Sequence, residues 1–346
     1  MAVLNMAVRR ENHLEMRKVH RRLASMVLLF LIVSLVLPLD LPAQDRYVIS
    51  YGGFSGYQIP LWVTKDLGLL EKYKIPADVV MIPGSPRQMQ ALLGGSIHFT
   101  QTDATGPVTA FLRGADLIIV AVALNKFPLS VVTQTEIRQP ADLAGKRIGI
   151  VNFGGQNELS ILLALKAWKI PKEAVTIVPS GATDTRLLAM RTKAIDATVF
   201  APPDTIKAEQ LGFRILAHMS DLNAAFPLDA IVTHRSFLEK NRGVVKRFLQ
   251  AYLEGIRIVK SDKQRTVNVY QKMLKQPDRL IMEKTFDYYA PQFSMPPRAN
   301  KEGLRTTADF ITQRQAGLKP GVEVERMLDE SLLDELEREG FFNKLQ

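Results

Sequence analysis

The distribution of apolar residues along the chain predicts short strands that alternate with helices. Strands are expected at residues 47–51, 79–82, 97–100, 117–123, 147–151, 175–178, 195–200, 213–216 and 230–233. Helices are expected between them, at 59–67, 88–93, 107–112, 158–168, 183–192 and 204–210. The run 117–123 (LIIVAVA) is apolar throughout, which is typical of a strand buried on both faces. This alternation indicates an α/β fold.

From about residue 236 the pattern becomes almost entirely helical. Helices are expected at 244–259, 266–274, 279–286, 301–313 and 324–338. In the last of these, Leu332, Leu333 and Leu336 share one face, so we expect this helix to dock on the core. The segment 126–139 lacks helical periodicity and divides the preceding strands and helices into two groups.

The two groups repeat one order: strand, Gly-Gly, helix, strand, Pro, short helix, strand. The landmarks pair as Gly52-Gly53 with Gly154-Gly155, Pro83 with Pro179, Ala91 with Ala189, and Ile97 with Ile195. Repeated strand–helix–strand units predict parallel sheets with helices on both faces. Because a polar segment separates the copies, we expect two similar α/β domains rather than one sheet.

Residues 1–43 differ from the rest of the chain. A basic cluster at 17–22 precedes an apolar run from Leu23 to Leu39, and Leu41-Pro42-Ala43 ends on a small residue. This layout predicts a secretory signal peptide, and hence an exported, periplasmic protein. The apolar run is near the lower length limit for a membrane span, so an uncleaved anchor is the alternative.

Composition narrows the chemistry. The chain of 346 residues has no cysteine, which excludes disulfides, thiolate metal sites and a cysteine nucleophile. Its net charge of +10 is spread along the sequence without a basic stripe or a recognisable nucleic-acid motif. The five histidines show no metal-ligand spacing. We therefore expect no nucleic-acid partner, no metal and no cofactor.

Ligands of open α/β sheets bind beyond the carboxyl ends of the strands. In both copies the loops at these ends combine glycine, polar side chains and helix starts, and helix starts attract anions. If the two domains face each other, both sets of loops converge on one cleft. The ligand-binding residues are then expected to be Gly53, Phe54, Ser55, Gly84, Ser85, Thr102, Asp103, Phe127, Gly154, Gly155, Gln156, Thr183, Pro202 and Asp229.

Catalytic motifs are not recognisable. Ser55 lies in Gly-Phe-Ser-Gly, but Tyr57 stands where a nucleophile elbow needs its second glycine. Gly145-Lys146-Arg147 lacks the upstream glycine and the Ser/Thr of a phosphate-binding loop. The sequence therefore favours a binding protein over an enzyme.

Four stretches in order suggest a family: 67–71 (LGLLE), 90–98 (QALLGGSIH), 142–149 (DLAGKRIG) and 194–197 (AIDA). Over about residues 47–315 the chain resembles the periplasmic substrate-binding proteins of ABC transporters. The resemblance is to the nitrate/sulfonate/taurine and thiamine-pyrimidine-precursor (NMT1/THI5-like) group. Two departures stand out: Ser96 and His98 frame Ile97 where many relatives have Gly-Asp, and the cysteine-rich motif of pyrimidine synthases is missing.

The resemblance implies a type II periplasmic-binding-protein fold, with two α/β lobes joined by crossover strands near 126–134 and 218–230. Lobe 1 would comprise 45–125 and 230–346, and lobe 2 would comprise 130–225. It further implies a monomeric receptor that delivers a small organic molecule to an ABC permease, with the strand-end loops as its binding residues. Membrane contact would occur only through that permease or an uncleaved anchor.

Two alternatives remain at this stage. An enzyme on the same fold could act on a pyrimidine or amine precursor. The effector domain of a transcription regulator would need a helix-turn-helix segment, whereas residues 1–43 have the pattern of an export signal. The ligand's charge is also open. Arg87, Arg186 and helix starts suit a sulfonate or carboxylate, whereas Asp103, Asp204, Asp229 and the loop aromatics suit an amine or a heteroaromatic base.

Overall fold

The computed structural model describes Met16, residues 21–23 and 25–26, and then residues 46–222, 225–315, 317–318 and 321–345. Contacts divide the chain into two units, residues 1–45 and residues 46–346, and the fold given below is that of the second unit. The predicted signal peptide, residues 1–43, falls almost wholly outside the described residues. Within the described part of the chain, no helix combines the length and the apolar character needed to cross a membrane.

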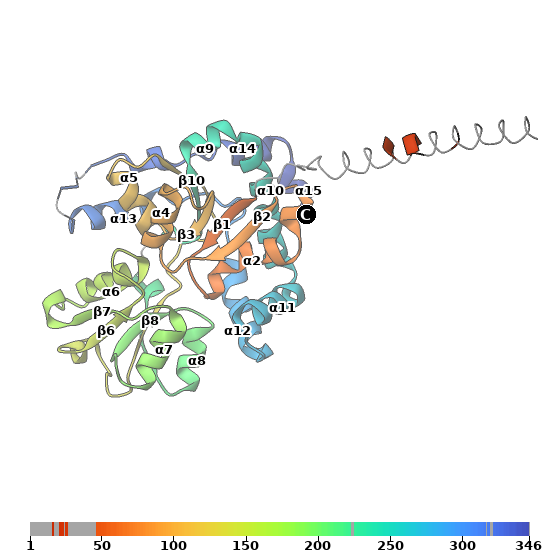
Figure 1. Ribbon diagram of the computed structural model, residues 1–346. Coiled ribbons are helices and arrows are strands. Elements are labelled where there is room, and N and C mark those ends of the chain that lie inside the picture. The colour runs from red at the N-terminus through yellow and green to blue at the C-terminus, as the bar shows by residue number, and fades with distance from the viewer. Residues whose placement is uncertain are drawn as a thin grey trace, which may run out of the picture. The chain divides into compact units, whose positions relative to one another are not determined.

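Two five-stranded sheets form the centre of residues 46–346 (Figure 1). The first has the order β2-β1-β3-β10-β4. Its strands are Tyr47–Tyr51 (β1), Ala77–Met81 (β2), Phe99–Thr102 (β3), Leu117–Val122 (β4) and Ala230–His234 (β10). Strands β1, β2 and β3 are parallel, whereas β10 runs antiparallel to both β3 and β4. β4 is buried along its whole length, as its uninterrupted apolar sequence predicts.

The second sheet repeats this arrangement in the order β7-β6-β8-β5-β9. Its strands are Ser130–Thr133 (β5), Arg147–Ile150 (β6), Thr176–Pro179 (β7), Ala197–Phe200 (β8) and Arg214–His218 (β9). Here β6, β7 and β8 are parallel and β5 is antiparallel to its two neighbours. The prediction of an α/β fold with two sheets is confirmed. We call each sheet with its helices the first and the second lobe.

The strand–helix–strand units of both sheets are parallel, as the repeat predicts, and each sheet also takes one antiparallel strand from a connection between the lobes. β10 enters the first sheet only after the chain has returned from the second. β5 lies within 126–139, where the apolar pattern predicted no strand, but it falls in the crossover strand near 126–134 that the resemblance implied. All four of its residues are buried, so its sequence Ser-Val-Val-Thr shows no alternation that could reveal it.

The two connections between the lobes run side by side. Lys126 and Ala225 form an antiparallel bridge, and the Leu228 amide donates a hydrogen bond to the Leu124 carbonyl at 2.7 Å. The rings of Phe127 and Phe226 stack with their centroids 4.0 Å apart. Such a paired, short connection is the usual place for a hinge between two lobes.

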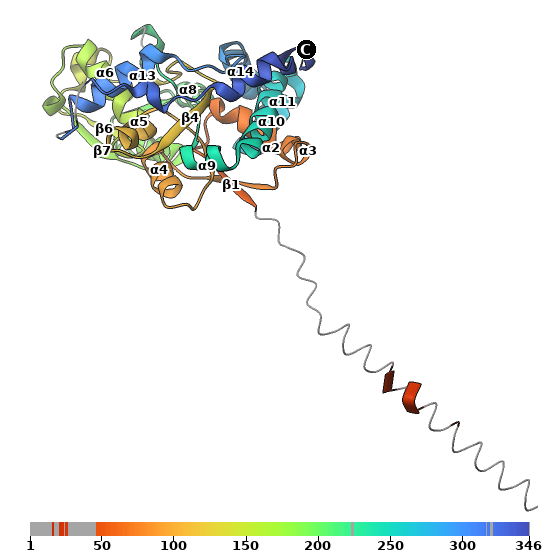
Figure 2. The same ribbon diagram turned by 90° about the horizontal axis from the view of Figure 1, so that it is seen from above.

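Helices cover both faces of the first sheet. The helices between its strands are Ile59–Asp66 (α2), Leu69–Lys72 (α3), Ser85–Leu93 (α4) and Thr105–Leu112 (α5). The chain then ends in Arg235–Lys240 (α9), Arg242–Ser261 (α10), Lys263–Leu274 (α11), Arg279–Tyr289 (α12), Lys301–Thr312 (α13), Ser331–Arg338 (α14) and Phe341–Lys344 (α15). α10 and α11 contact α2 on one face, and α13 contacts α5 on the other (Figure 2).

The predicted helix at 324–338 is interrupted. A 3-10 turn at Val324–Met327 is followed by an extended stretch before α14 begins at Ser331. In that stretch Leu328 bridges to Ile119, and the Asp329 amide donates to the Ile119 carbonyl at 2.9 Å. The chain leaves the helix because its backbone pairs with the edge of β4, which the local sequence does not indicate.

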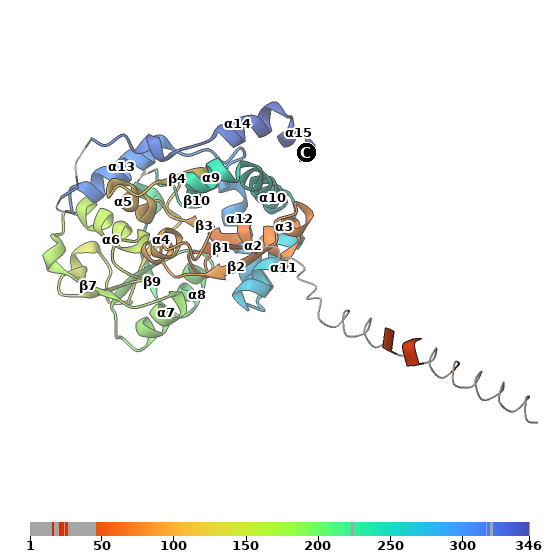
Figure 3. The same ribbon diagram turned by 45° about the horizontal axis from the view of Figure 1, so that its top comes forward.

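In the described part of the chain, the α-helices that cover the second sheet are Gln156–Ala167 (α6), Thr183–Arg191 (α7) and Asp204–Gln210 (α8). α6 lies on one face of the sheet, and α7 and α8 lie on the other (Figure 3). α4, α6 and α7 all begin directly after a strand-end loop. Their first turns therefore lie at the edges of the two sheets where the parallel strands end.

Candidate functional site

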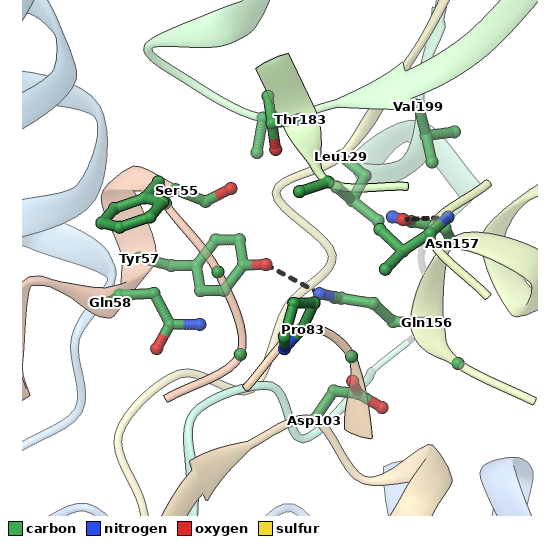
Figure 4. A pocket seen from close by; sticks show the side chains of 18 of the residues that line it. Ser55, Tyr57, Gln58, Pro83, Asp103, Leu129, Gln156, Asn157, Thr183 and Val199 are labelled. Atoms are coloured by element: carbon green, nitrogen blue, oxygen red, sulfur yellow. Dashed lines mark hydrogen bonds between the residues drawn. The ribbon is translucent and has the colours of Figure 1, made fainter. Parts of the chain in front are cut away.

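A cavity of about 60 Å³ lies between the lobes, at the carboxyl ends of the parallel strands of both sheets. Its lining comes from the loops after β1, β2 and β3 in the first lobe and after β6, β7 and β8 in the second. Figure 4 shows side chains from both lobes pointing into this space. A cavity of this size has room for roughly four to six water-sized groups.

Nine of the fourteen predicted ligand-binding residues line the cavity. They are Gly53, Phe54, Ser55, Gly84, Thr102, Asp103, Gly155, Gln156 and Thr183. They come from both copies of the sequence repeat, so the two sets of strand-end loops do face one cavity. Their contact with a ligand stays a prediction.

The other five residues lie outside the lining. Ser85 is buried behind it and donates a hydrogen bond to Asp103 Oδ1 at 3.0 Å. Phe127 stacks on Phe226 in the connection between the lobes. Gly154 donates its amide to Glu158 Oε2 at 2.7 Å, and the Pro202 carbonyl accepts the Gly56 amide at 3.0 Å. Asp229 is buried directly before β10, where it accepts a hydrogen bond from Gln101 Nε2 at 3.3 Å.

Several lining residues were missed or left undecided by the sequence. Tyr57, Gln58, Gln88 and Asn152 line the cavity, and so does Arg186, which the sequence left as either an anion clamp or a surface residue. Arg87 is exposed and lies outside the lining. Gln88 and Arg186 belong to the first turns of α4 and α7, one turn after a strand-end Gly/Ser loop. This position, one turn after a strand-end loop, was the sequence signal that could have identified both residues as lining the cavity.

Asp103 supplies a buried carboxylate from the first lobe; the residue is 6% exposed. Its Oδ1 accepts hydrogen bonds from the Ser85 hydroxyl at 3.0 Å, from the Thr105 amide at 2.9 Å and from the Thr105 hydroxyl. Burial raises the pKa of Asp103, and these hydrogen bonds oppose that rise. The site therefore holds an acidic group away from water at the floor of the cavity.

Arg186 supplies a buried guanidinium from the second lobe; the residue is 3% exposed. Its Nη1 donates to the Thr198 hydroxyl at 2.8 Å and to the Val199 carbonyl at 2.6 Å, and its Nε donates to the Gly181 carbonyl at 3.2 Å. Its guanidinium carbon lies 4.9 Å from the centre of the Phe200 ring. Burial lowers the pKa of Arg186 to about 10, while the negative charge of Asp204 favours its charged form. At neutral pH the group carries a positive charge.

Asp204 lies behind the cavity at the start of α8. Its side chain forms an ion pair with Lys207 at 3.2 Å, but its Oδ2 is buried without a hydrogen-bond partner among the described residues. Burial raises the pKa of Asp204 to about 6, although Lys207 opposes this. The carboxyl therefore changes charge in a mildly acidic range.

Among the described residues, three hydrogen bonds join the lobes around the cavity. Gln156 Nε2 donates to the Tyr57 hydroxyl at 2.7 Å (Figure 4), and the Gly56 amide donates to the Pro202 carbonyl at 3.0 Å. Asn152 Nδ2 donates to the Pro83 carbonyl at 3.3 Å. These bonds hold the two lobes against each other beside the cavity.

The chemistry available here is recognition of a small polar molecule. The lining carries hydroxyl, amide, carboxylate and guanidinium groups together with the rings of Phe54, Tyr57 and Phe200. Such a mixture of apolar surface and a few placed polar groups is typical of ligand sites. Among the described residues, no group of three His, Asp or Glu side chains is placed to hold a metal ion.

Comparison with proteins of known sequence gives distant relatives over most of the chain. A Brucella abortus protein named as a binding protein is 28% identical over 258 residues, which are 73% of this chain and 78% of the relative. An aliphatic sulfonates-binding protein of Escherichia coli is 26% identical over 272 residues, which are 76% of this chain and 83% of the relative.

A solved structure supports the fold. The alkanesulfonate-binding protein from Xanthomonas axonopodis bound to MOPS superposes with a TM-score of 0.70 at 21% identity, covering 82% of this chain and 98% of its own. At this identity the likeness shows the fold alone. It confirms the predicted two-lobed periplasmic-binding-protein fold.

The family itself follows from the sequence match. The family model described as NMT1/THI5 like matches residues 56–265, which is more than half of the chain and includes loops from both lobes of the cavity. The resemblance drawn from the four sequence stretches is thereby confirmed, and the chain belongs to the NMT1/THI5-like family.

Proposed function

We propose that this protein is an exported solute-binding receptor that captures a small organic molecule between its lobes and delivers it to the permease of an ABC transporter. The observation that carries the proposal is the position of the cavity. Its lining comes from equivalent loops of the two lobes, so a molecule bound there contacts both. A ligand with contacts on both lobes stabilises the closed arrangement, so ligand binding shifts the equilibrium from the open to the closed form.

The mechanism needs no covalent step. In an open arrangement the ligand reaches the polar groups of one lobe, and closure adds the groups of the other. The paired connections at Lys126 and Ala225 allow such a movement because they are the only places where the chain passes between the sheets among the described residues. A permease that recognises the closed surface would then receive loaded receptors in preference to empty ones.

The relatives support this reading. The Escherichia coli relative is named as an aliphatic sulfonates-binding protein, and the Xanthomonas structure is that of an alkanesulfonate-binding protein. Export is supported by the predicted signal peptide at residues 1–43, which would place the mature receptor in the periplasm. The cavity's size supports a ligand of only a few non-hydrogen atoms.

A native mass spectrum of residues 44–346, purified from cells without denaturation, tests the proposal. We expect an extra mass of a small molecule that is lost on mild activation and recovered chemically unchanged. The same preparation unfolded in acid serves as the control and should show the bare chain mass. A bare native spectrum, followed by no thermal stabilisation by sulfonates, carboxylates, amines or pyrimidines, would contradict a solute receptor. Conversion of a panel compound would point to the enzyme alternative.

A further inference from the structure

Two buried side chains of opposite charge line the cavity, one from each lobe. Asp103 follows β3 of the first lobe, and Arg186 lies in the first turn of α7 of the second. Figure 4 shows Asp103 on the opposite side of the cavity from Thr183, the first residue of α7. Neither Asp103 nor Arg186 forms a direct ion pair within the described part of the chain; the negative charge of Asp204, which pairs with Lys207, acts on Arg186 from behind the cavity. A buried charge without a partner is costly, so such groups usually meet an opposite charge.

Each of the two groups keeps hydrogen-bonding capacity for a ligand. The hydrogen bonds to Asp103 all end on Oδ1, and Oδ2 accepts none from the described residues. Arg186 uses Nε and Nη1 fully, whereas Nη2 makes one long contact, to the Thr183 hydroxyl at 3.4 Å. One N–H of Nη2 is therefore left for an acceptor, and one oxygen of Asp103 is left for a donor.

The internal repeat places Gln88 and Arg186 at matching positions of the two lobes, where their side chains make matching hydrogen bonds but differ in charge. Gln88 and Arg186 are 98 residues apart, the same offset that separates Ala91 from Ala189. Gln88 Nε2 donates to the Thr100 hydroxyl at 2.7 Å and to the Gln101 carbonyl at 3.1 Å.

Arg186 Nη1 makes the equivalent pair of bonds to Thr198 and Val199, again 98 residues further on. The offset places Ala201 where the first lobe has Asp103. The first lobe thus combines a neutral amide with a carboxylate, and the second combines a guanidinium with a methyl group.

We propose that the ligand is a small dipolar molecule that carries both an acidic group and an ammonium group, a deepening that rests on the receptor function proposed above. Its carboxylate or sulfonate binds Arg186 on the second lobe, and its ammonium binds Asp103 on the first. The two ends of the ligand then neutralise the charges of Asp103 and Arg186, and only the closed arrangement allows both contacts. The third charged lining residue, Asp184, is exposed to water and is screened accordingly.

Matched ligands test this inference directly. Titration calorimetry on residues 44–346 at pH 7 would measure the binding of four dipolar compounds: glycine, β-alanine, 2-aminoethanesulfonate and 3-aminopropanesulfonate. Each is compared with two matched compounds, the acid that lacks its amine and the amine that lacks its acidic group. We expect at least one dipolar compound to bind at least tenfold more tightly than either of its matched partners, because both buried charges gain a counter-charge.

Three variants separate the two ends of the ligand. Asp103→Asn keeps an oxygen for Ser85 and Thr105 and should abolish the preference for the dipolar compound over its amine-free acid. Arg186→Gln retains the bonds that Gln88 makes in the first lobe, so it should fold, and it should weaken every compound with an acidic group at least tenfold. Glu173→Gln, the control at an exposed acid of the second lobe outside the cavity lining, should leave all affinities within twofold.

The results separate this inference from the receptor function. An amine-free acid that binds within threefold of its dipolar partner, or a preference that survives Asp103→Asn, would overturn the dipolar ligand and leave the receptor standing. If no compound of the panel binds, the molecule released in the native mass spectrum decides. A co-purified molecule with both charges supports the inference, and one without both overturns it alone. If neither experiment detects a bound molecule, both proposals are overturned.

Discussion

The hydrogen bond between Gln156 Nε2 and the Tyr57 hydroxyl offers a direct test of how the lobes are held together. Tyr57 is 7% exposed, and the bond is 2.7 Å long. Tyr57→Phe removes the acceptor without changing the shape of the ring. In the closed arrangement Gln156 then keeps an amide group without a partner, which costs about 1–3 kcal/mol. In an open arrangement water binds that amide, so the cost falls on the closed state alone.

A cost of this size shifts the balance between closed and open forms by about five- to 150-fold. Because the chain has no cysteine, a dye pair attached at Leu93→Cys and Leu188→Cys reports on the two lobes without further changes. Both positions are exposed, on α4 of the first lobe and α7 of the second. Single-molecule energy transfer should show a larger open population in Tyr57→Phe than in the labelled parent.

The matched control is Tyr252→Phe, which removes another buried hydroxyl. Tyr252 donates to Gln101 Oε1 at 3.0 Å within the first lobe, so its loss should lower stability without changing the distance between the lobes. Identical energy-transfer distributions for Tyr57→Phe and the parent would refute the view that this bond holds the lobes closed. An equal shift in Tyr252→Phe would show that the effect is not specific to the contact between the lobes.

Two further perturbations test the cavity's surroundings. A Cβ at Gly84, whose φ is +78°, would lie 2.4 Å from Asn152 Nδ2 of the other lobe, so Gly84→Ala should weaken ligand binding, measured by calorimetry, at least fivefold. The control is Gly95→Ala. Gly95 has a φ of +73° and open space around it, so this variant carries the same backbone strain and should leave the affinity unchanged. If both variants bind alike, the contact between the lobes is not the cause. A further prediction concerns pH: burial raises the pKa of Asp204 to about 6 from a usual 3.8, so the folded chain binds this proton more tightly than the unfolded chain. The free energy of unfolding should therefore fall by on the order of 3 kcal/mol as pH rises from about 4 to about 6. Urea unfolding should show that Asp204→Asn lacks this part of the pH dependence, and parallel profiles for the two proteins would exclude the assignment.

The end of β3 shows why part of the site could not be read from the sequence. The expected strand at 97–100 lies two residues too early, because Thr100-Gln101-Thr102 is polar and resembles a loop. In the structure these residues are buried strand residues. The Thr100 hydroxyl accepts a hydrogen bond from Ser50, and Gln101 accepts one from Tyr252, 151 residues further along the chain. Polar residues can be buried only when partners are available, and those partners come from distant segments.

Phe127 and Arg186 illustrate the same limit for the candidate site. Both are large side chains near strand-end loops; the sequence predicted that Phe127 binds the ligand and left the role of Arg186 open. Phe127 stacks on the ring of Phe226 in the connection that returns to the first lobe, whereas Arg186 donates hydrogen bonds to Thr198 and Val199 beside the cavity. Local pattern places a residue at the edge of a sheet, but the direction of its side chain depends on what packs against it.

The resemblance of four short sequence stretches indicated the family, and the sequence by itself determined the alternation of strands and helices and the internal repeat that predicts two lobes. These properties depend on local propensity and on apolar periodicity, which a single chain displays openly. Only the tertiary structure decided that one antiparallel strand enters each sheet, and that Asp103 and Arg186 face one cavity from opposite lobes. Those outcomes depend on strand pairing and side-chain contacts between segments far apart in the chain. Their free energies exist only once the chain has folded.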